Sequence, residues 1–422
     1  MISVEEALEK ILAAVCALEP EEKTLLDCLG QVLAIDAVST IDVPPHNNSA
    51  MDGYAVRSAD LNKASTGRPV ILKVIGEVAA GYVSQKKVTQ GTAIRIMTGA
   101  PMPEGADAVV QFENTDEIQR KDCHKTLNEI GIFGPVKNGL NVRYRGEDIR
   151  TGQAVLKKGT VLRAAEIGVL ASLGKASVAV IRRPVVSVLS TGDELCDING
   201  PLEAGKIYNS NSYSIAASIA SCGGIPKILG IGRDTIKSLR QKINEGLKAD
   251  MLITSGGVSK GDYDVVKDVL AAMGEIDFWT VRMKPGKPLA FGTIKKRGKG
   301  KYRAIPHLGL PGNPASSMIT FEQFARPAIL KMMGKKNFER PMVEAVIDGS
   351  IINGDGRRIY ARVVVSQTGG GYRASLTGPQ GSGILTSMSL ANGLAVIPED
   401  CPAIKAGDNV TVQLLDCENV LI

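Results

Sequence analysis

The fold is decided by Met251-Leu-Ile-Thr-Ser-Gly-Gly-Val-Ser-Lys-Gly-Asp-Tyr-Asp264, where an apolar strand runs directly into a glycine-rich turn that ends in two carboxylates. In an open α/β sheet, ligands bind beyond the carboxyl ends of the strands, and glycines let the backbone approach a phosphate closely. A second strand and turn, Val185-Val-Ser-Val-Leu-Ser-Thr-Gly-Asp-Glu194, repeats this arrangement. Because hard cations select oxygen ligands, the two turns predict a phosphate ligand bridged by a divalent cation. Two ordinary connections between strand and helix are the alternative.

Outward from these turns, the region from about 184 to 334 alternates apolar strands with helical stretches, which predicts βαβ units and a mostly parallel sheet. Residues from about 45 to 145 consist of short β segments with frequent turns, which is typical of a small β-rich domain. Beyond Gly334 the strands are short again, and their spacing predicts a compact barrel or sandwich.

Composition limits the classes of protein that the chain can belong to. Its 422 residues imply two to four domains, and the formal charge of +6 is too small to indicate nucleic acid binding. The seven cysteines form no C-x-x-C pair, so neither a disulfide framework nor a zinc module is indicated. Ser3 opens a capped helix instead of a signal peptide, and no apolar run reaches membrane-spanning length. We therefore expect a cytoplasmic protein without membrane or nucleic acid partners.

Three further segments carry polar patterns that allow two interpretations each. In Gly309-Leu-Pro-Gly-Asn-Pro314, Asn313 suits an N-cap and Pro314 the first helical position, so free N–H groups are predicted to face an anion. A rigid, well-capped helix is the alternative. Lys284-Pro-Gly-Lys287 places two ammonium groups on a fixed turn, which suits an oxyanion or a solvated surface. Lys295–Arg303 holds six basic residues in nine and is expected to be a solvated hairpin tip.

Seven motifs in family order resemble the MoeA-type molybdopterin molybdenumtransferases, which share their fold with the E domain of gephyrin. They are Pro44-Pro-His-Asn-Asn-Ser-Ala-Met-Asp-Gly-Tyr-Ala55, Arg95-Ile-Met-Thr-Gly-Ala-Pro101, Asn141-Val-Arg-Tyr-Arg-Gly-Glu-Asp148, Ser190-Thr-Gly-Asp-Glu-Leu195, Ser255-Gly-Gly-Val-Ser259, Lys284-Pro-Gly-Lys-Pro288 and Gly309-Leu-Pro-Gly-Asn-Pro314.

The resemblance implies an α/β multidomain fold of four parts. These are a helical linker region (residues 1–44 with 146–181), a β-rich domain (45–145), an α/β molybdopterin-binding domain with a mostly parallel sheet (182–334) and a C-terminal β barrel (335–422). It also implies a reaction in which adenylylated molybdopterin and molybdate yield molybdenum cofactor and AMP, with Mg²⁺ assisting.

The resemblance further implies the residues of the site, position by position. The catalytic set is Asp52, Thr98, Asp148, Asp193, Glu194, Asp234 and Asp264, of which Asp193, Glu194 and Asp264 would hold the metal. The cofactor-binding set is Ser255, Gly256, Gly257, Ser259, Asp262, Lys284, Lys287, Pro311, Gly312, Asn313 and Pro314.

The implied partners are a second copy of the chain and a separate protein. In the family the site lies at a homodimer interface, so Asp52 and Thr98 would face the glycine-rich turns of the other subunit. This chain has one α/β unit with such a turn, so a separate molybdopterin adenylyltransferase would supply the substrate. Alternatives are a gephyrin-like scaffold, against which the intact carboxylates argue, a tungstate-inserting variant, and an enzyme that shares only the α/β domain.

Overall fold

The structure is a computed structural model that describes residues 1–122, 128–257, 265–297 and 302–416. The chain divides into two compact units, which we describe separately. The first unit combines Met1–Lys23, Cys28–Ala34 and Ala179–Ile422, and the second combines Thr24–Asp27 and Ile35–Val178. The chain passes between them in β1 (Pro20–Thr24) and β11 (Ser177–Ile181).

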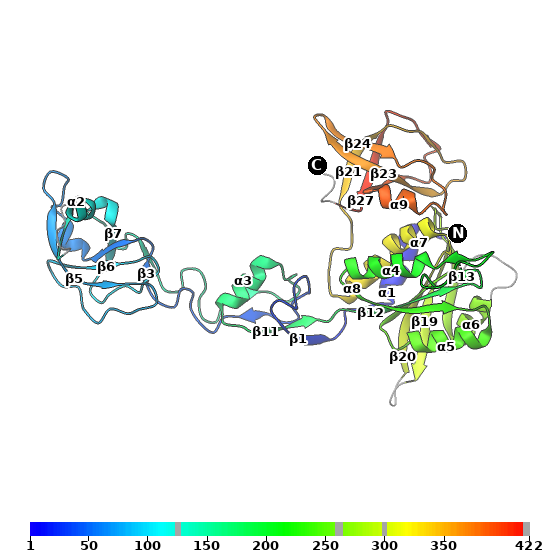
Figure 1. Ribbon diagram of the computed structural model, residues 1–422, viewed down its shortest axis with the longest axis horizontal. Coiled ribbons are helices and arrows are strands. Elements are labelled where there is room, and N and C mark those ends of the chain that lie inside the picture. The colour runs from blue at the N-terminus through cyan, green and yellow to red at the C-terminus, as the bar shows by residue number, and fades with distance from the viewer. Residues whose placement is uncertain (123–127, 258–264, 298–301, 417–422) are drawn as a thin grey trace. The chain divides into compact units, whose positions relative to one another are not determined.

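The centre of the first unit is a six-stranded sheet in the order β15-β12-β16-β20-β19-β17 (Figure 1). Neighbours from β15 to β20 are parallel, and β19 and β17 are antiparallel, so the predicted α/β fold with a mostly parallel sheet is confirmed. The strands are β12 (Val185–Thr191), β15 (Ile225–Gly232), β16 (Met251–Ser255), β17 (Gly274–Thr280), β19 (Pro288–Arg297) and β20 (Tyr302–Leu310). The pairing of β19 with β20 continues to Arg297 and Tyr302, and residues 298–301 of the predicted hairpin tip lie outside the described residues.

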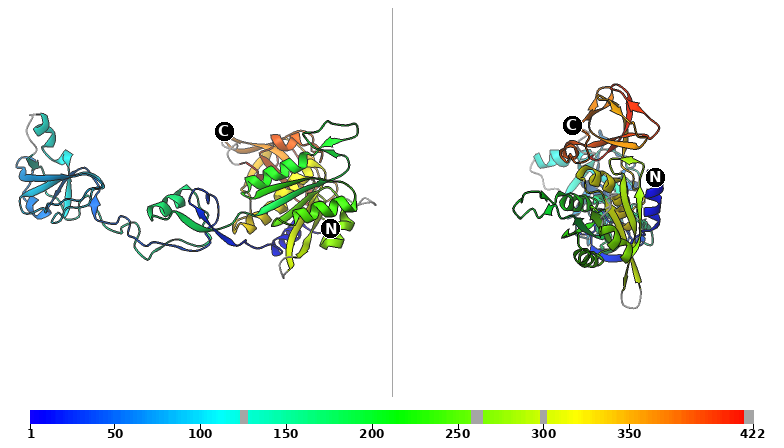
Figure 2. Two further views of the ribbon diagram at one scale, coloured as in Figure 1. Left: turned by 60° about the horizontal axis from the view of Figure 1, so that its bottom comes forward. Right: turned by 90° about the vertical axis from the view of Figure 1, so that its right-hand side faces the viewer.

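Helices cover both faces of this sheet because its central strands are apolar on both sides (Figure 2). All five residues of β16 are buried; Met251 and Ile253 join the core on one face, and Leu252 joins the core on the other. The first face carries α1 (Val4–Ala13), α4 (Ser210–Ser221), α7 (Pro314–Thr320), the π-helical turn η3 (Phe321–Ala325) and α8 (Arg326–Met332). The second face carries α5 (Ile236–Gly246) and α6 (Val265–Met273).

The C-terminal part of the first unit is a closed barrel of five strands, which settles the choice that the sequence left open between barrel and sandwich (Figure 2). The ring runs β23-β24-β21-β27-β25 and closes between β25 and β23. Its strands are β21 (Met342–Ile347), β23 (Arg358–Thr368), β24 (Gly371–Leu376), β25 (Gly393–Ile397) and β27 (Asn409–Leu414), with α9 (Thr386–Leu390) between β24 and β25. Beside it lie the short strands β22 (Ile351–Ile352) and β26 (Ala403–Ile404).

The second unit contains a five-stranded sheet in the order β7-β4-β6-β5-β8. Along β4, Tyr54 and Val56 pack into one core and Ala55 into another, so both faces are covered. The strands are β4 (Gly53–Val56), β5 (Val70–Val78), β6 (Thr92–Ile96), β7 (Ala108–Gln111) and β8 (Glu129–Ile132). The remaining elements are β2 (Ala37–Val38), β3 (Asn48–Ser49), β9 (Val142–Arg143), β10 (Ala154–Leu156), η1 (Ser58–Leu61), η2 (Phe112–Asn114), α2 (Glu117–Asp122) and α3 (Ala164–Ser172).

Over the described ranges of both units, no helix is long and apolar enough to cross a membrane. The boundaries predicted for the four domains stay predictions.

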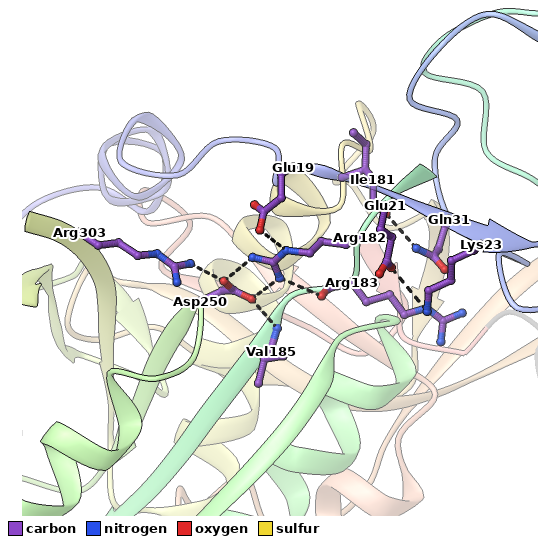
Figure 3. Close-up of polar contacts among 10 residues, drawn as sticks. All are labelled: Glu19, Glu21, Lys23, Gln31, Ile181, Arg182, Arg183, Val185, Asp250 and Arg303. Atoms are coloured by element: carbon purple, nitrogen blue, oxygen red, sulfur yellow. Dashed lines mark hydrogen bonds and ion pairs between the residues drawn. The ribbon is translucent and has the colours of Figure 1, made fainter. Parts of the chain in front are cut away.

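Within the first unit, a buried carboxylate holds the segments that enter the sheet (Figure 3). Both oxygens of Asp250 accept hydrogen bonds from the Arg182 guanidinium, at 2.5 and 2.6 Å, and one accepts from the Val185 backbone N–H. Arg303 donates to the same carboxylate, and Glu19 accepts from Nε of Arg182 at 2.7 Å. The N-terminal ends of β12 and β16 are therefore fixed together, at the end of the sheet opposite the glycine-rich turns.

Candidate functional site

A pocket of about 340 Å³ opens beyond the carboxyl ends of β12 and β16, where the two glycine-rich turns begin. Its lining comes from four segments of the first unit that lie far apart in the sequence. They are Ser190, Thr191, Glu194 and Leu195 at and after the end of β12; Ile207 and Tyr208 of β14 (Ile207–Tyr208) with Asn209, Ser210 and Asn211 at the start of α4; Ser255 at the end of β16; and Gly312, Asn313 and Pro314 at the start of α7. Serine, threonine and asparagine side chains share this lining with apolar groups, a mixture that suits a ligand with polar and apolar parts.

Three predicted acidic residues lie in the turns beside the pocket: Asp193 and Glu194 after β12, and Asp234 after β15. Asp193 and Asp234 exchange hydrogen bonds, since each backbone N–H donates to the other's carboxylate at 3.3 Å. Glu194 lines the pocket and is exposed. Gly192 has φ of +141°, a backbone conformation that favours glycine at this position.

Two cations hold the backbone of this turn. Lys206 and Arg233 both donate to the backbone carbonyl of Asp193, and Arg233 also donates to that of Leu195 at 3.0 Å. These bonds leave the carboxylate oxygens of Glu194 free of described partners. In the described part of the chain, no three acidic, histidine or cysteine side chains already form a metal-binding group. The predicted metal ligands therefore stay predictions, and Asp264 lies outside the described residues.

The turn after β16 begins as the sequence predicts. Gly256 and Gly257 have φ of +95° and +68°, and a Cβ would lie 2.7 Å from the Thr191 carbonyl oxygen at Gly256 and 2.6 Å from the Val266 side chain at Gly257. Both positions therefore need glycine on conformational and steric grounds. Of the other residues predicted in this turn, Ser259, Asp262 and Asp264 lie outside the described residues.

The start of α7 differs from the prediction in one respect. Asn313 occupies the N-cap and Pro314 the first helical position, as predicted. However, the Asn313 amide donates to Ser382 Oγ at 3.1 Å, and the Ala315 N–H donates to the Ser382 carbonyl at 3.0 Å. The prediction of free N–H groups is therefore wrong for Ala315, because a barrel residue distant in sequence already satisfies this donor.

Asn211 is a pocket residue that the sequence did not reveal. Its amide Nδ2 donates to Ser255 Oγ at 2.8 Å and to the Gly312 carbonyl at 2.7 Å. These two bonds join the start of α4 to the end of β16 and to the segment before α7. Ser255 Oγ in turn donates to the Pro311 carbonyl at 3.3 Å. The only local signal is that the helix begins with polar residues, which is typical of a capped helix as well as of a site.

The lysine turn belongs to the same unit and packs on α7. A Cβ at Gly286 would lie 2.5 Å from Thr320 Oγ1, so the turn approaches the helix closely. Both Lys284 and Lys287 are exposed, and Lys284 Nζ lies 4.0 Å from the Asp355 carboxylate. A hydrogen bond from Arg357 lowers the pKa of Asp355, and Lys284 contributes to this shift. Within the described residues, no hydrogen bond or ion pair joins the two lysine side chains to the pocket lining.

In the second unit, Asp52 and Thr98 lie together. Asp52 Oδ1 accepts from the Thr98 backbone N–H at 2.6 Å and from its hydroxyl at 2.7 Å, which lowers the pKa of the Asp52 carboxyl. Asp52 directly precedes β4 and Thr98 follows β6, and the pairing of Gly53 with Ile96 brings these two strand ends together. Asp148 is exposed, and its backbone N–H donates to the Val43 carbonyl at 3.1 Å. Within the described residues, its carboxylate makes no hydrogen bond to the Asp52–Thr98 pair.

Beside this pair lies a buried ion pair that the sequence did not indicate. Arg95 on β6 donates from Nη2 to Glu117 at 3.0 Å and from Nη1 to Glu77 at 3.3 Å. Burial raises the pKa of Glu117, but its bonds from Arg95 and Lys121 outweigh burial and lower the pKa overall. Arg95 therefore fixes the strand that leads into Thr98.

Comparisons with known proteins match nearly the whole chain. Residues 2–174 match the model of the MoeA N-terminal region (domain I and II), residues 187–331 that of a probable molybdopterin binding domain, and residues 344–415 that of the MoeA C-terminal region (domain IV). The chain is 37% identical to a molybdopterin molybdenumtransferase of Nostoc sp., over 98% of this chain and 93% of the relative. It is 35% identical to molybdopterin molybdenumtransferase 2 of Mycobacterium tuberculosis, over 98% and 99%.

Among solved structures, the fold is similar to the molybdopterin biosynthesis MoeA protein from Pyrococcus horikosii. The TM-score is 0.81 at 33% sequence identity, and the match covers 99% of each chain.

Proposed function

Because the chain belongs to the MoeA family of molybdopterin molybdenumtransferases, we propose that it inserts molybdenum from molybdate into adenylylated molybdopterin and releases AMP. The observation that supports this most directly is the pocket beyond β12 and β16, which Glu194 lines and which lies where the glycine turns begin, with Asp193 and Asp234 hydrogen-bonded to each other in the adjoining turns. A ligand with a heterocycle, a phosphoanhydride and oxygen groups fits such a lining.

Mg²⁺ fits the acidic rim, because carboxylate oxygens are its preferred protein ligands. Asp193, Glu194 and the predicted Asp264 would hold it, directly or through water. Mg²⁺ held there would supply positive charge beside the phosphate oxygens, which would favour cleavage of the phosphoanhydride and release of AMP. Lys206 and Arg233 hold the Asp193 backbone carbonyl, which fixes the turn that carries Asp193 and Glu194.

Two ammonium groups on the Lys284–Lys287 turn suit the oxyanion. Pro285 and Gly286 are buried against the body of the unit, so the turn presents Lys284 and Lys287 to solvent from a fixed backbone. The soft ligands that receive the metal are the two dithiolene sulfurs of the substrate, so the protein needs no thiolate of its own.

The proposal includes a homodimer and a donor protein. Asp52 and Thr98 form a pre-organised acceptor and hydroxyl pair at the surface of the second unit. In line with the family resemblance, we assign this pair to the site of a partner subunit. A separate molybdopterin adenylyltransferase would supply the adenylylated substrate.

The test is a release assay with purified protein, adenylylated molybdopterin, MgCl₂ and molybdate. AMP and active cofactor should appear only when both the oxyanion and the divalent cation are present, and EDTA should stop AMP release. Tungstate in place of molybdate measures which oxyanion the protein prefers. Equal AMP release with EDTA and without any oxyanion would overturn the metal-assisted transfer.

A further inference from the structure

A buried ion pair lies on the strand that leads into Thr98. The side chain of Glu117 is 2% exposed, and that of Arg95 is 17% exposed. Arg95 donates to Glu117 from Nη2 at 3.0 Å and from Nε at 3.4 Å, so two nitrogens of the guanidinium meet the two oxygens of the carboxylate. Lys121 donates to the same carboxylate at 2.5 Å. The guanidinium therefore has a fixed orientation.

Stability alone does not explain this ion pair. Moving two charges out of water is costly, and apolar side chains of similar volume often stabilise a core as well as a buried ion pair does. A buried pair can instead fix one particular arrangement of the chain. The contacts of Arg95 beyond Glu117 identify that arrangement.

The remaining nitrogen of Arg95, Nη1, contacts the residue before Thr98. It donates to Met97 Sδ at 3.5 Å and to Glu77 at 3.3 Å. Thr98 in turn donates to Asp52 Oδ1 from its backbone N–H and from its hydroxyl. These bonds lower the pKa of the Asp52 carboxyl, and the charge of Arg95 lowers it further. A chain of contacts thus runs from the buried ion pair through Met97 to the Asp52–Thr98 pair.

Thr98 itself is held by a side chain instead of by the sheet. The N–H groups on either side of it donate to backbone carbonyls, at 3.1 Å for Met97 and 2.8 Å for Gly99. The Thr98 N–H donates to the Asp52 carboxylate. The direction of this N–H and of the hydroxyl therefore depends on the side chains that pack beside the turn.

We propose that the buried Arg95–Glu117 pair is a positioning element for the transfer reaction. It holds Met97 so that the N–H and the hydroxyl of Thr98 both face Asp52. The proposal rests on the proposed function, in which Asp52 and Thr98 complete the site of a partner subunit. Arg95 and Glu117 act through Thr98, so they are positioning residues, and their loss should lower turnover more than substrate affinity.

The experiment replaces the ion pair by apolar side chains in the full-length protein. Arg95→Met combined with Glu117→Met removes both charges at once, so neither stays buried without its partner. The matched control is Arg120→Met, because the side chain of Arg120 is 18% exposed and bonds to Asp116 at 2.7 Å in the same unit. Within the described residues, no hydrogen bond or ion pair joins Arg120 to the Asp52–Thr98 pair.

Three properties of each variant are measured: the midpoint of thermal denaturation, the kcat and KM of AMP release, and the hydrogen exchange rate of the Thr98 amide. In the variant without the ion pair, kcat should fall at least about tenfold while KM stays within about twofold of wild type. The Thr98 amide should exchange about tenfold faster, because its bond to Asp52 opens more often. The midpoint should stay close to that of wild type. Arg120→Met should match wild type in kcat and in exchange.

An unchanged kcat in the variant without the ion pair would overturn the proposal, whatever the exchange rate. A loss of kcat without faster exchange at Thr98 would overturn it too, as would an equal loss of kcat in Arg120→Met. If the double variant does not fold, Arg95→Lys replaces it, since one ammonium group cannot reproduce the fork that bonds to Glu117 and Met97 together. Wild-type protein that releases no AMP would refute the reaction, whereas the exchange rates would still show whether the ion pair holds Thr98.

Discussion

At the scale of single residues, Asp250 shows how one buried carboxylate fixes three chain segments. Burial by itself raises the pKa of Asp250, but the hydrogen bonds from Arg182, Val185 and Arg303 outweigh burial and lower the pKa to about 2 (Figure 3). The two arginines differ in their surroundings, since the side chain of Arg182 is 19% exposed and that of Arg303 is 52% exposed. They therefore form a matched pair for measuring what the cluster contributes.

We expect Arg182→Met to lower the free energy of unfolding by about 3 kcal/mol, because it leaves a buried carboxylate short of a partner. Arg303→Met should lower it by less than about 1 kcal/mol, since that pair is largely solvated. Urea denaturation measures the free energy of unfolding of both variants. The signal is the fluorescence of Trp279, the single tryptophan, which lies in β17 of the sheet that the cluster anchors. Equal decreases in the free energy of unfolding for the two variants would contradict the idea that burial of the Arg182–Asp250 pair sets its contribution.

The same cluster predicts a dependence on pH. Because the folded-state pKa of Asp250 is lowered from 3.8 to about 2, its contribution is complete above 3.8 and is lost as the pH falls toward 2. Asp250→Asn should remove about 2 kcal/mol at pH 7, and the difference from wild type should shrink between pH 4 and pH 2. A difference that grows on acidification would show that the carboxylate is not stabilised as an anion.

At the scale of elements, the glycine turn after β16 depends on steric contact as well as on backbone conformation. Gly257 and Gly230 both have positive φ, +68° and +83°, so an alanine is strained at either position. A Cβ at Gly257 would lie 2.6 Å from the Val266 side chain, whereas at Gly230 the nearest atom is Lys242 Nζ at 4.0 Å. Comparing alanine at the two positions therefore separates the cost of backbone strain, which both share, from the cost of steric overlap, which only Gly257 has.

Gly230→Ala should therefore cost about 1 kcal/mol of stability and leave AMP release nearly unchanged. Gly257→Ala should cost about 2 kcal/mol or more and reduce AMP release at least tenfold, since α6 and the turn must move apart. Thermal denaturation and the release assay compare the two variants directly. Equal activity in both would mean that the turn shapes no part of the site.

At the scale of the whole molecule, the proposed homodimer predicts complementation between inactive subunits. Asp52→Ala and Glu194→Ala homodimers should each be nearly inactive while still folding, because both side chains are exposed and their loss opens no core cavity. In a symmetric dimer whose sites each combine Asp52 of one subunit with Glu194 of the other, the mixed dimer has one intact site.

A purified mixed dimer should therefore recover up to about half of the wild-type AMP release per dimer. Separately tagged subunits allow its isolation, and remixed wild-type subunits serve as the control. A mixed dimer as inactive as its parents would contradict a site shared between subunits.

The sequence by itself determined the features that depend on local pattern. The apolar run Met251–Ser255 forms a buried strand, Ser3 caps α1, and Asn313 and Pro314 start α7. Each follows from residues within a few positions of one another, because strand burial and helix capping are properties of a short segment. The seven motifs likewise identified the family, since their order and spacing are written along the chain.

Only the tertiary structure decided where distant polar groups meet. Asn211 bonds to Gly312, 101 residues away, and Asp250 bonds to Arg182, 68 residues away. The Ala315 N–H, which the local pattern predicted to be free, donates to the Ser382 carbonyl. The pairing of β25 with β23 closes the barrel. A hydrogen-bonding group shows its type in the sequence, but whether it is satisfied depends on which distant donors and acceptors the packed fold brings within about 3 Å.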